Sequence, residues 1–200
     1  MEKGSLAGIL VFAFVFAVFL MGLTAAEIVI SQPAGLYNVG DEFDMSIGLI
    51  PGANVNDFLI ADLICAEKSV NIYKSPFKIL AGERKDVLIK TNLDEFLLGD
   101  VKGLCVLNVR YGGEQRQSQN FGVTDSVDLK VSISTIGANP GERIEISGSA
   151  IKRNGMALEG FVKAGLGTDE SVVGIVVNGK FNLSFAVPEN SPYGMHSLEI

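Results

Sequence analysis

From Ile28 onward, hydrophobic and polar residues alternate with a period of two, and turn residues interrupt the alternation about every eight to twelve positions. Because successive side chains of a strand point to opposite faces of a sheet, this pattern is typical of a β-sandwich or a β-barrel. Asp41–Ile50 and Phe58–Cys65 are clear cases. The segments between the turns are too short for long helices. A single helical turn is predicted within 92–98. The chain is therefore predicted to be all-β.

Further strands are predicted on both sides of these two. In the first half of the chain they are Ile28–Ile30, a short edge strand Val70–Tyr73, Val87–Thr91, Cys105–Val109 and a last strand through Phe121 and Val123. Asn108 and Arg110 are predicted to face outward, because they alternate with the apolar residues of their strand. Gly112-Gly113 predicts a hairpin turn directly after it.

The second half of the chain repeats this kind of pattern. A new alternating series begins with Leu129, Val131 and Ile133. Asn154-Gly155 and Asn178-Gly179 both predict hairpins, because the two central residues of such a turn need positive φ, which Asn and Gly tolerate.

Thr124–Asp128 carries two acidic residues and no sustained apolar pattern, so we place a domain boundary there. The predicted organisation is a β-sandwich domain at 27–123, a linker at 124–128 and a second β-sandwich domain at 129–200. Asn38–Ser46 matches Asn139–Ser147 at the same Asn-x-Gly-acid turn and the alternation that follows it. This internal similarity favours two related modules. The alternative is that two unrelated modules each use the same common type of turn.

The first 26 residues differ from the rest of the chain. Lys3 precedes an unbroken apolar run, Leu6–Leu23, and small residues follow up to Ala26. This order is typical of a secretory signal peptide that is cleaved after Ala26. The run of 18 residues also fits an uncleaved membrane anchor through residues 6–23. In both cases the rest of the chain is predicted to lie outside the cytoplasm, secreted or at the cell surface.

Cys65 and Cys105 are the only two cysteines, and both fall in apolar alternating stretches. An even number of cysteines in an exported chain favours a disulfide, because thiols persist poorly in oxidising compartments. Both are predicted to lie on the core faces of strands that sandwich folds commonly place side by side. The alternative is two small apolar residues buried without a bridge.

The second module carries four features in order: a turn and strand at Asn139–Gly148, a hairpin at Asn154-Gly155 followed by Leu158–Val162, a strand in Asn178–Phe185 and a loop in Pro188–Leu198. In these features residues 129–200 resemble the immunoglobulin-like β-sandwich modules of microbial cell-surface, adhesin and macroglobulin-type proteins. Residues 28–123 resemble them only loosely. The resemblance implies two tandem immunoglobulin-like domains, which serve as spacers, adhesion tips and assembly parts alike. The thioester motif of full macroglobulins is missing, so protease trapping is not implied.

Candidate catalytic and metal-binding residues are few. The single histidine, His196, lies in the last predicted strand, where a structural role is favoured over that of a catalytic base. No HExxH, Gly-x-Ser-x-Gly, phosphate-loop or CxxC spacing occurs. Asp125 and Asp128 are candidate calcium ligands at the domain junction, but the dense spacing of a calcium loop is missing, so solvated linker acids are the preferred interpretation. We predict neither an enzyme nor a cofactor.

Two further observations concern partners. Acidic residues outnumber basic ones, 23 to 16, and the net charge of −7 argues against nucleic-acid binding, which needs a clustered basic face. Asn182-Leu183-Ser184 is an N-glycosylation acceptor pattern in which the alternation points Asn182 outward, and the alternative is a chance triplet.

The sequence therefore favours a non-catalytic surface or secreted module with a structural or adhesive role, bound to other surface proteins or to glycans. The alternative is an extracytoplasmic ligand-binding or inhibitor-type protein that works through a pocket between its domains. A third hypothesis is a fragment of a larger surface protein whose activity lies beyond residue 200. Tyr37, Tyr73, Tyr111 and Tyr193 are too dispersed in the sequence to indicate a pocket.

Overall fold

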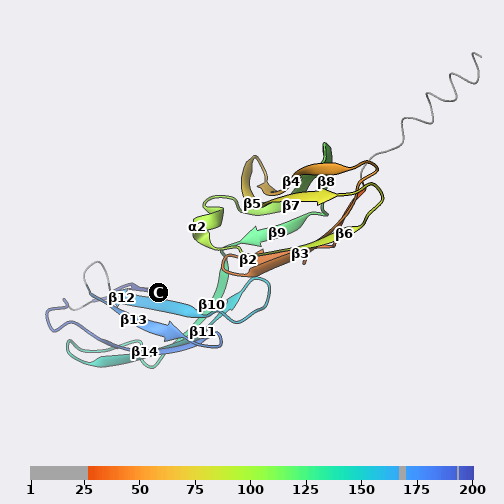
Figure 1. The fold of residues 1–200 in the computed structure, drawn as a ribbon. Coiled ribbons are helices and arrows are strands. Elements are labelled where there is room, and N and C mark those ends of the chain that lie inside the picture. Colours follow the sequence, from red (N-terminus) through yellow and green to blue (C-terminus); the bar gives the residue numbers. More distant parts are fainter. Residues whose placement is uncertain (1–26, 167–169, 193) are drawn as a thin grey trace, which may run out of the picture. The chain divides into compact units, whose positions relative to one another are not determined.

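The computed structural model describes residues 27–166, 170–192 and 194–200. Within these ranges the regular structure is almost entirely β-strand, interrupted by one short helix, α2 (Glu95–Leu98), in Figure 1. This helix confirms the helical turn predicted within 92–98. The predicted signal or anchor segment and the cleavage site after Ala26 lie outside the described residues. No helix in the described ranges is long and apolar enough to cross a membrane.

Two sheets are formed by the strands that precede the predicted linker. One sheet has the antiparallel order β1-β3-β6, and the other has the order β2-β9-β7-β4-β5, with β8 also paired with β7. The strands are β1 (Glu27–Ile30), β2 (Leu36–Asn38), β3 (Glu42–Ile50), β4 (Val55–Cys65), β5 (Lys68–Ile79), β6 (Lys85–Asn92), β7 (Gly103–Tyr111), β8 (Glu114–Gln117) and β9 (Phe121–Thr124).

The apolar rows predicted for β3 and β4 form the core of this part of the chain. Alternate side chains along β3 and along the second half of β4 are buried: Phe43, Met45, Ile47, Leu49, Leu59, Ala61, Leu63 and Cys65. The ring of Phe43 lies 5.7 Å from that of Phe121 on β9, centroid to centroid. Fully burying one large apolar side chain stabilises the fold by about 1.5–3 kcal/mol, so these rows are its main source of stability.

Two strands differ from their predicted form. β5 is 12 residues long, whereas the sequence predicted a short strand at Val70–Tyr73. Its lysines and Pro76 hide the alternation, yet proline is tolerated in a strand at the edge of a sheet. On β7, Asn108 is buried although it was predicted to face outward with Arg110. Asn108 is in register with Asp62 on β4 and with Gln117 on β8, so a strand residue lies beside it on each side.

The predicted disulfide between Cys65 and Cys105 is confirmed. The two cysteines are direct register partners on the neighbouring strands β4 and β7, with their Cα atoms 4.1 Å apart, and both are 1% exposed. The bridge therefore fastens two central strands of one sheet on its core side. A buried disulfide is also consistent with an oxidising compartment outside the cytoplasm.

Two further sheets are formed by the later strands. Their orders are β10-β11-β14 and β13-β12-β15, and all described pairings are antiparallel. The strands are β10 (Val127–Ile133), β11 (Arg143–Lys152), β12 (Gly160–Leu166), β13 (Glu170–Val176), β14 (Lys180–Ala186) and β15 (Leu198–Glu199). Their core holds Ile146, Ala150, Val162, Ala164, Val176, Phe181, Leu183 and Phe185.

The described chain divides into two compact units. The first comprises the residues up to Gly35 together with Gly40–Gly122, and the second comprises Leu36–Val39 together with Val123–Ile200. Within the predicted linker 124–128, β9 ends at Thr124 and β10 begins at Val127, so most of that range is strand. The sequence did not predict that 36–39 groups with the later residues, because compactness depends on contacts between distant segments.

The Asn-x-Gly-acid turn occurs in equivalent places before β3 and β11. Gly40 and Gly141 both have positive φ, +86° and +84°, and each turn leads into the central strand of a three-stranded sheet. In the second turn the backbone N–H and the side-chain Nδ2 of Asn139 donate to the carboxylate of Glu142, both at 2.9 Å. These hydrogen bonds hold the pKa of Glu142 below its ordinary value.

Removing the disulfide is expected to lower the free energy of unfolding by about 4 kcal/mol, because the unfolded chain regains the entropy of an open loop of 40 residues. The change is Cys65→Ala together with Cys105→Ala, measured by urea unfolding followed by circular dichroism. Reductant should lower the free energy of unfolding of the wild type and leave that of the double variant unchanged. A double variant as stable as the oxidised wild type would contradict this account.

The Asn139→Ala variant is expected to raise the pKa of Glu142 toward its ordinary value, because the side-chain donor to the carboxylate is lost. Because the pKa of Glu142 is lower in the folded state than in the unfolded state, its ionised carboxylate stabilises the fold. This stabilisation is fully present at pH values above the pKa of the unfolded state, and it is lost as the pH falls through the pKa of the folded state. NMR titrations of the Glu142 carboxyl in the wild type and in the variant give the titration midpoint of each protein. Equal midpoints in the wild type and the variant would show that the amide has no such role.

Candidate interaction surface

Four large apolar side chains form a cluster on the outer face of β12 and β13. Phe161 lies directly opposite Ile175 and diagonal to Val173, and Val177 follows directly after the last residue of β13. The alternate residues Val162, Gly174 and Val176 face inward, toward the core of the second unit. We call Phe161, Val173, Ile175 and Val177 the outer apolar cluster.

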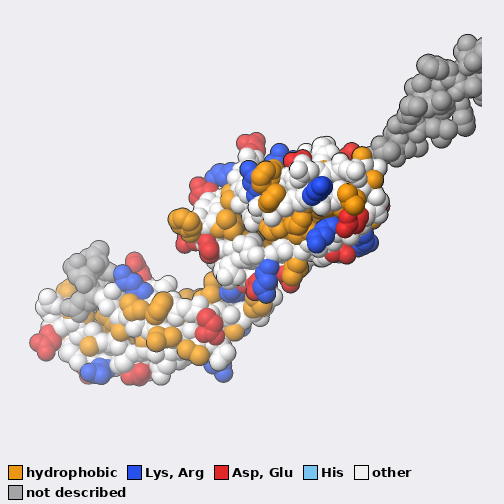
Figure 2. Space-filling model, in the orientation of Figure 1, with side chains coloured by type: hydrophobic (Ala, Val, Ile, Leu, Met, Phe, Trp, Pro, Cys, Tyr) orange, Lys and Arg blue, Asp and Glu red, His pale blue; other side chains and the backbone are white. Residues whose placement is uncertain are grey.

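Each side chain of the outer apolar cluster is more than half exposed. The exposed fractions of its side chains are 77% for Phe161, 64% for Ile175, 61% for Val173 and 54% for Val177. Figure 2 shows hydrophobic side chains gathered over β12 and β13. Single exposed apolar residues are normal on protein surfaces, whereas a contiguous group on one sheet face is a candidate contact surface.

A rigid hairpin holds one end of this surface. Asn178 and Gly179 have φ of +50° and +69°, which confirms the hairpin predicted from Asn-Gly. The backbone N–H of Asn178 donates to Glu159 Oε1 at 2.7 Å, which ties the turn to the start of β12. A Cβ atom at position 179 would lie 2.9 Å from the carbonyl oxygen of Ala150, so only glycine fits this close approach.

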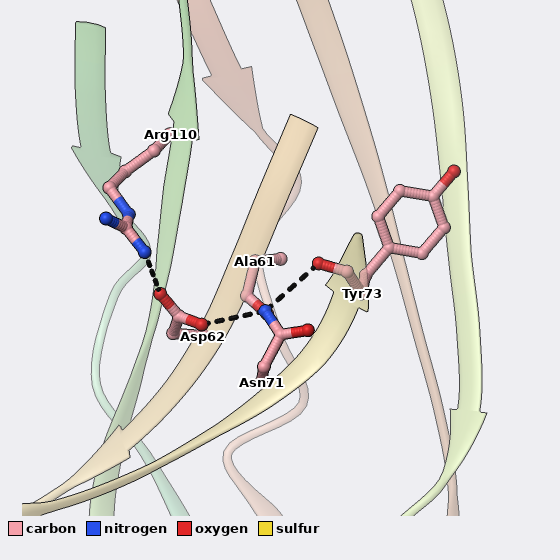
Figure 3. Close-up of polar contacts among 5 residues, drawn as sticks. All are labelled: Ala61, Asp62, Asn71, Tyr73 and Arg110. Carbon is pink, nitrogen blue, oxygen red and sulfur yellow. Dashed lines mark hydrogen bonds and ion pairs between the residues drawn. The ribbon is translucent and has the colours of Figure 1, made fainter. Parts of the chain in front are cut away.

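A polar cluster occupies the outer face of β4, β5 and β7 in the first unit. Figure 3 shows the side chains of Arg110 and Asn71 both directed at Asp62. Arg110 Nη2 donates to Asp62 Oδ2 at 2.7 Å, and Asn71 Nδ2 donates to Asp62 Oδ1 at 2.8 Å. The amide of Asn71 also lies 3.3 Å from the carbonyl oxygens of Ala61 and Tyr73.

This polar cluster has a structural origin. The register of β4 and β5 shifts between Ala61 and Asp62, where Ile72 is an extra residue on β5. Such a bulge disrupts the ladder locally, and the amide of Asn71 donates to the backbone carbonyls of Ala61 and Tyr73 beside it. Because each polar group here is already paired within the sheet, the arrangement stabilises the bulge and offers little to a ligand.

A groove of about 350 Å³ lies between β1 and β8, lined by Glu27–Gln32 and Arg116–Gln119. Seven of its ten lining residues are charged or polar, and the other three are Ile28, Val29 and Ile30. Cofactor sites combine an apolar lining with a few convergent polar groups, a feature that this groove lacks. We therefore do not assign it a ligand.

The residues predicted for chemistry lie apart from one another. Asp128 pairs with Arg153, Oδ1 to Nη1 at 3.3 Å, and among the described residues no group of three or more His, Cys, Asp or Glu side chains is placed to hold a metal ion. His196 lies before β15 and not within the last strand as predicted, and its Nε2 lies 2.7 Å from the carbonyl oxygen of Pro192. Asp125 and Asp128 are thus not gathered with further carboxylates, and calcium binding there stays a prediction.

The glycosylation candidate Asn182 lies in β14 with its side chain exposed, between buried Phe181 and Leu183. Its outward direction agrees with the alternation. Whether it is modified stays a prediction, because a strand paired with β11 presents the acceptor less openly than a loop does.

No protein-family model and no curated protein sequence matches the chain. A β-glucosidase from Listeria innocua is similar over 51% of this chain and 16% of its own, with 14% identity and a TM-score of 0.41. A trypsin-activated α2-macroglobulin from Escherichia coli is similar over 84% of this chain and 14% of its own, with 14% identity and a TM-score of 0.36. An alkylpurine DNA glycosylase from Pseudomonas fluorescens is similar over 54% and 32%, with 21% identity and a TM-score of 0.37.

The chain thus spans about a sixth of the length of the glucosidase. All three TM-scores are below 0.5, so these likenesses carry no argument about function. The predicted immunoglobulin-like character of the two units likewise stays a prediction.

Proposed function

We propose that this protein is a non-catalytic, extracytoplasmic binding module that contacts another protein through the outer apolar cluster of β12 and β13. The observation that carries the proposal is the exposure of four adjacent large apolar side chains on one sheet face. Apolar surface of this kind gains free energy when it is removed from water, at about 25 cal/mol per Å². The buried disulfide supports the location outside the cytoplasm.

A protein partner is favoured over a glycan by the chemistry of this surface. Glycan recognition needs polar groups that pair with hydroxyls, whereas the outer apolar cluster presents four side chains without a polar atom. Protein interfaces have an apolar centre with a polar rim. Lys163, opposite Val173, and Glu159, beside the hairpin, supply charges at the border of the cluster.

The proposal predicts a site-specific contact in the cells that produce the protein. A photo-reactive benzoylphenylalanine at position 175 should form an adduct with a partner, because Ile175 lies in the middle of the cluster. The matched control carries the same group at position 88, since Leu88 is 62% exposed on β6 of the first unit. Adducts are measured by mobility shift and mass spectrometry.

The adduct should also be lost when the protein with the photo-reactive group at position 175 carries the substitution Phe161→Asp as well. The melting temperatures with and without Phe161→Asp must be equal for this comparison. Equal adducts at positions 88 and 175, or none at either, would contradict the proposal. An adduct that glycosidase removes and protease leaves intact would assign a glycan partner and would overturn the choice of protein.

A further inference from the structure

The outer apolar cluster has a negative charge at one end and a positive charge at the other. Glu159, directly before β12, and Phe161 and Lys163 within it are all exposed and occupy every second position. Leu158 packs against the core and Val162 belongs to it, so the three exposed side chains share the outer face. At a rise of about 3.3 Å per residue, the two charged residues lie about 13 Å apart along the strand, with the phenylalanine midway between them.

The neighbouring strand β13 completes each end of the cluster with a valine. Val173 is the register partner of Lys163. The same register, continued by one residue past its last pair, places Val177 beside Glu159, whose carboxylate accepts the N–H of Asn178. Each end of the cluster therefore carries one valine and one charge, and the two charges have opposite signs.

We propose that the partner of the outer apolar cluster is a second copy of this chain, packed face to face with the first about a two-fold axis. This inference rests on the proposed function and names its partner. The axis lies in the plane of the interface, runs at a right angle to the strands and passes over Phe161 and Ile175, which are register partners. Each of these two side chains then meets the same side chain of the other copy.

This arrangement brings apolar groups onto apolar groups and each charge onto its opposite. A half-turn about such an axis exchanges the two ends of the cluster, so Val173 of one copy faces Val177 of the other. In the same way Lys163 faces Glu159, and the symmetry produces this ion pair twice. The interface then has an apolar centre with charged groups at its border, which is the usual anatomy of a protein interface.

The charges argue against the other two-fold packing of this face. An axis parallel to the strands leaves the two ends of the cluster where they are. Lys163 would then face either Val173 or the same lysine of the other copy, and Glu159 would face either Val177 or the same glutamate. A charge that is taken out of water without an opposite charge is costly, and so is a pair of like charges.

The order of the charges also favours a second copy over an unrelated protein. A surface must be complementary to itself only when the same patch packs on itself about a two-fold axis. An unrelated partner requires only that its own surface match this one, and opposite charges at equal distances from the centre bring it no advantage. The symmetric placement of Glu159 and Lys163 about Phe161 is therefore the observation that selects the partner.

The dimer is expected to be weak. Each side of a standard protein interface contributes about 20–30 residues, far more than the outer apolar cluster and its two charges. The dissociation constant should therefore fall in the micromolar to millimolar range, and sedimentation equilibrium of the purified full chain at increasing concentrations measures it.

Two charge-reversal variants test the pairing. Lys163→Glu places an acidic residue at both ends of the cluster, and Glu159→Lys places a basic one at both ends. Each variant replaces two attractive pairs by two repulsive ones, so its dissociation constant should rise about tenfold or more. In an equimolar mixture of the two variants both pairs are attractive again, so a mixed dimer should form with the affinity of the wild type. The control Lys78→Glu makes the same charge change at an exposed site on β5 and should have no effect.

A second measurement is needed because Glu159 also holds the hairpin through the N–H of Asn178. If Glu159→Lys does not fold, photo-reactive benzoylphenylalanine at position 173 tests the axis instead. Its adduct with the other copy should map to the opposite end of the cluster, at Val177, by mass spectrometry of the digested dimer. An adduct that maps to the end at Lys163 would overturn the proposed axis.

The photo-reactive group at position 175 separates this inference from the proposed function. In the cells that produce the protein, its adduct should have twice the mass of the chain. An adduct with a different protein would overturn the second copy as partner and leave the proposed function standing, whereas no adduct would contradict both. A dimer that Lys163→Glu does not weaken, or a mixture of the two variants that stays monomeric, would overturn the inference alone.

Discussion

A strand in a sandwich has one face that needs cover from the opposite sheet and two edges whose backbone groups need partners. Both needs arise from the same cause, the loss of water on folding: apolar side chains gain by leaving water, and buried N–H and C=O groups lose unless they are paired. The central strands of the first unit meet both needs. β4 is paired on both edges by β5 and β7, its inner row is fully buried, and the disulfide fastens it to β7.

The second unit meets these needs only in part. Its core is built from β11, β12, β13 and β14. On the outer face of the sheet that contains β12 and β13, Phe161 and Ile175 face solvent. Exposed apolar surface of this kind gains free energy when another chain removes it from water. This gain is the physical basis of the proposed binding role.

The alternation of side chains predicted most of the fold because it depends only on local geometry. It placed Phe43, Leu59 and Cys105 on buried faces, and Asn178-Gly179 marked a hairpin with positive φ at both residues, whereas at Asn154-Gly155 only the glycine has positive φ. It missed the length of β5, where Lys74 and Pro76 break the pattern of a strand held by pairing with β4. It also treated Leu129 and Val173 as ordinary strand residues, since a period of two cannot show whether an opposite sheet is present. The candidate surface therefore emerged only when the strands were placed in space.

Methyl NMR with a soluble paramagnetic agent measures whether the outer apolar cluster is open to solvent. Strong broadening of the methyl signals of Val173 and Ile175, similar to that of exposed Leu88, is expected, while the methyls of Ile146 and Leu183 stay sharp. Methyls of Val173 and Ile175 as protected as that of Ile146 would contradict an open surface, because the cluster would then be covered within the protein itself.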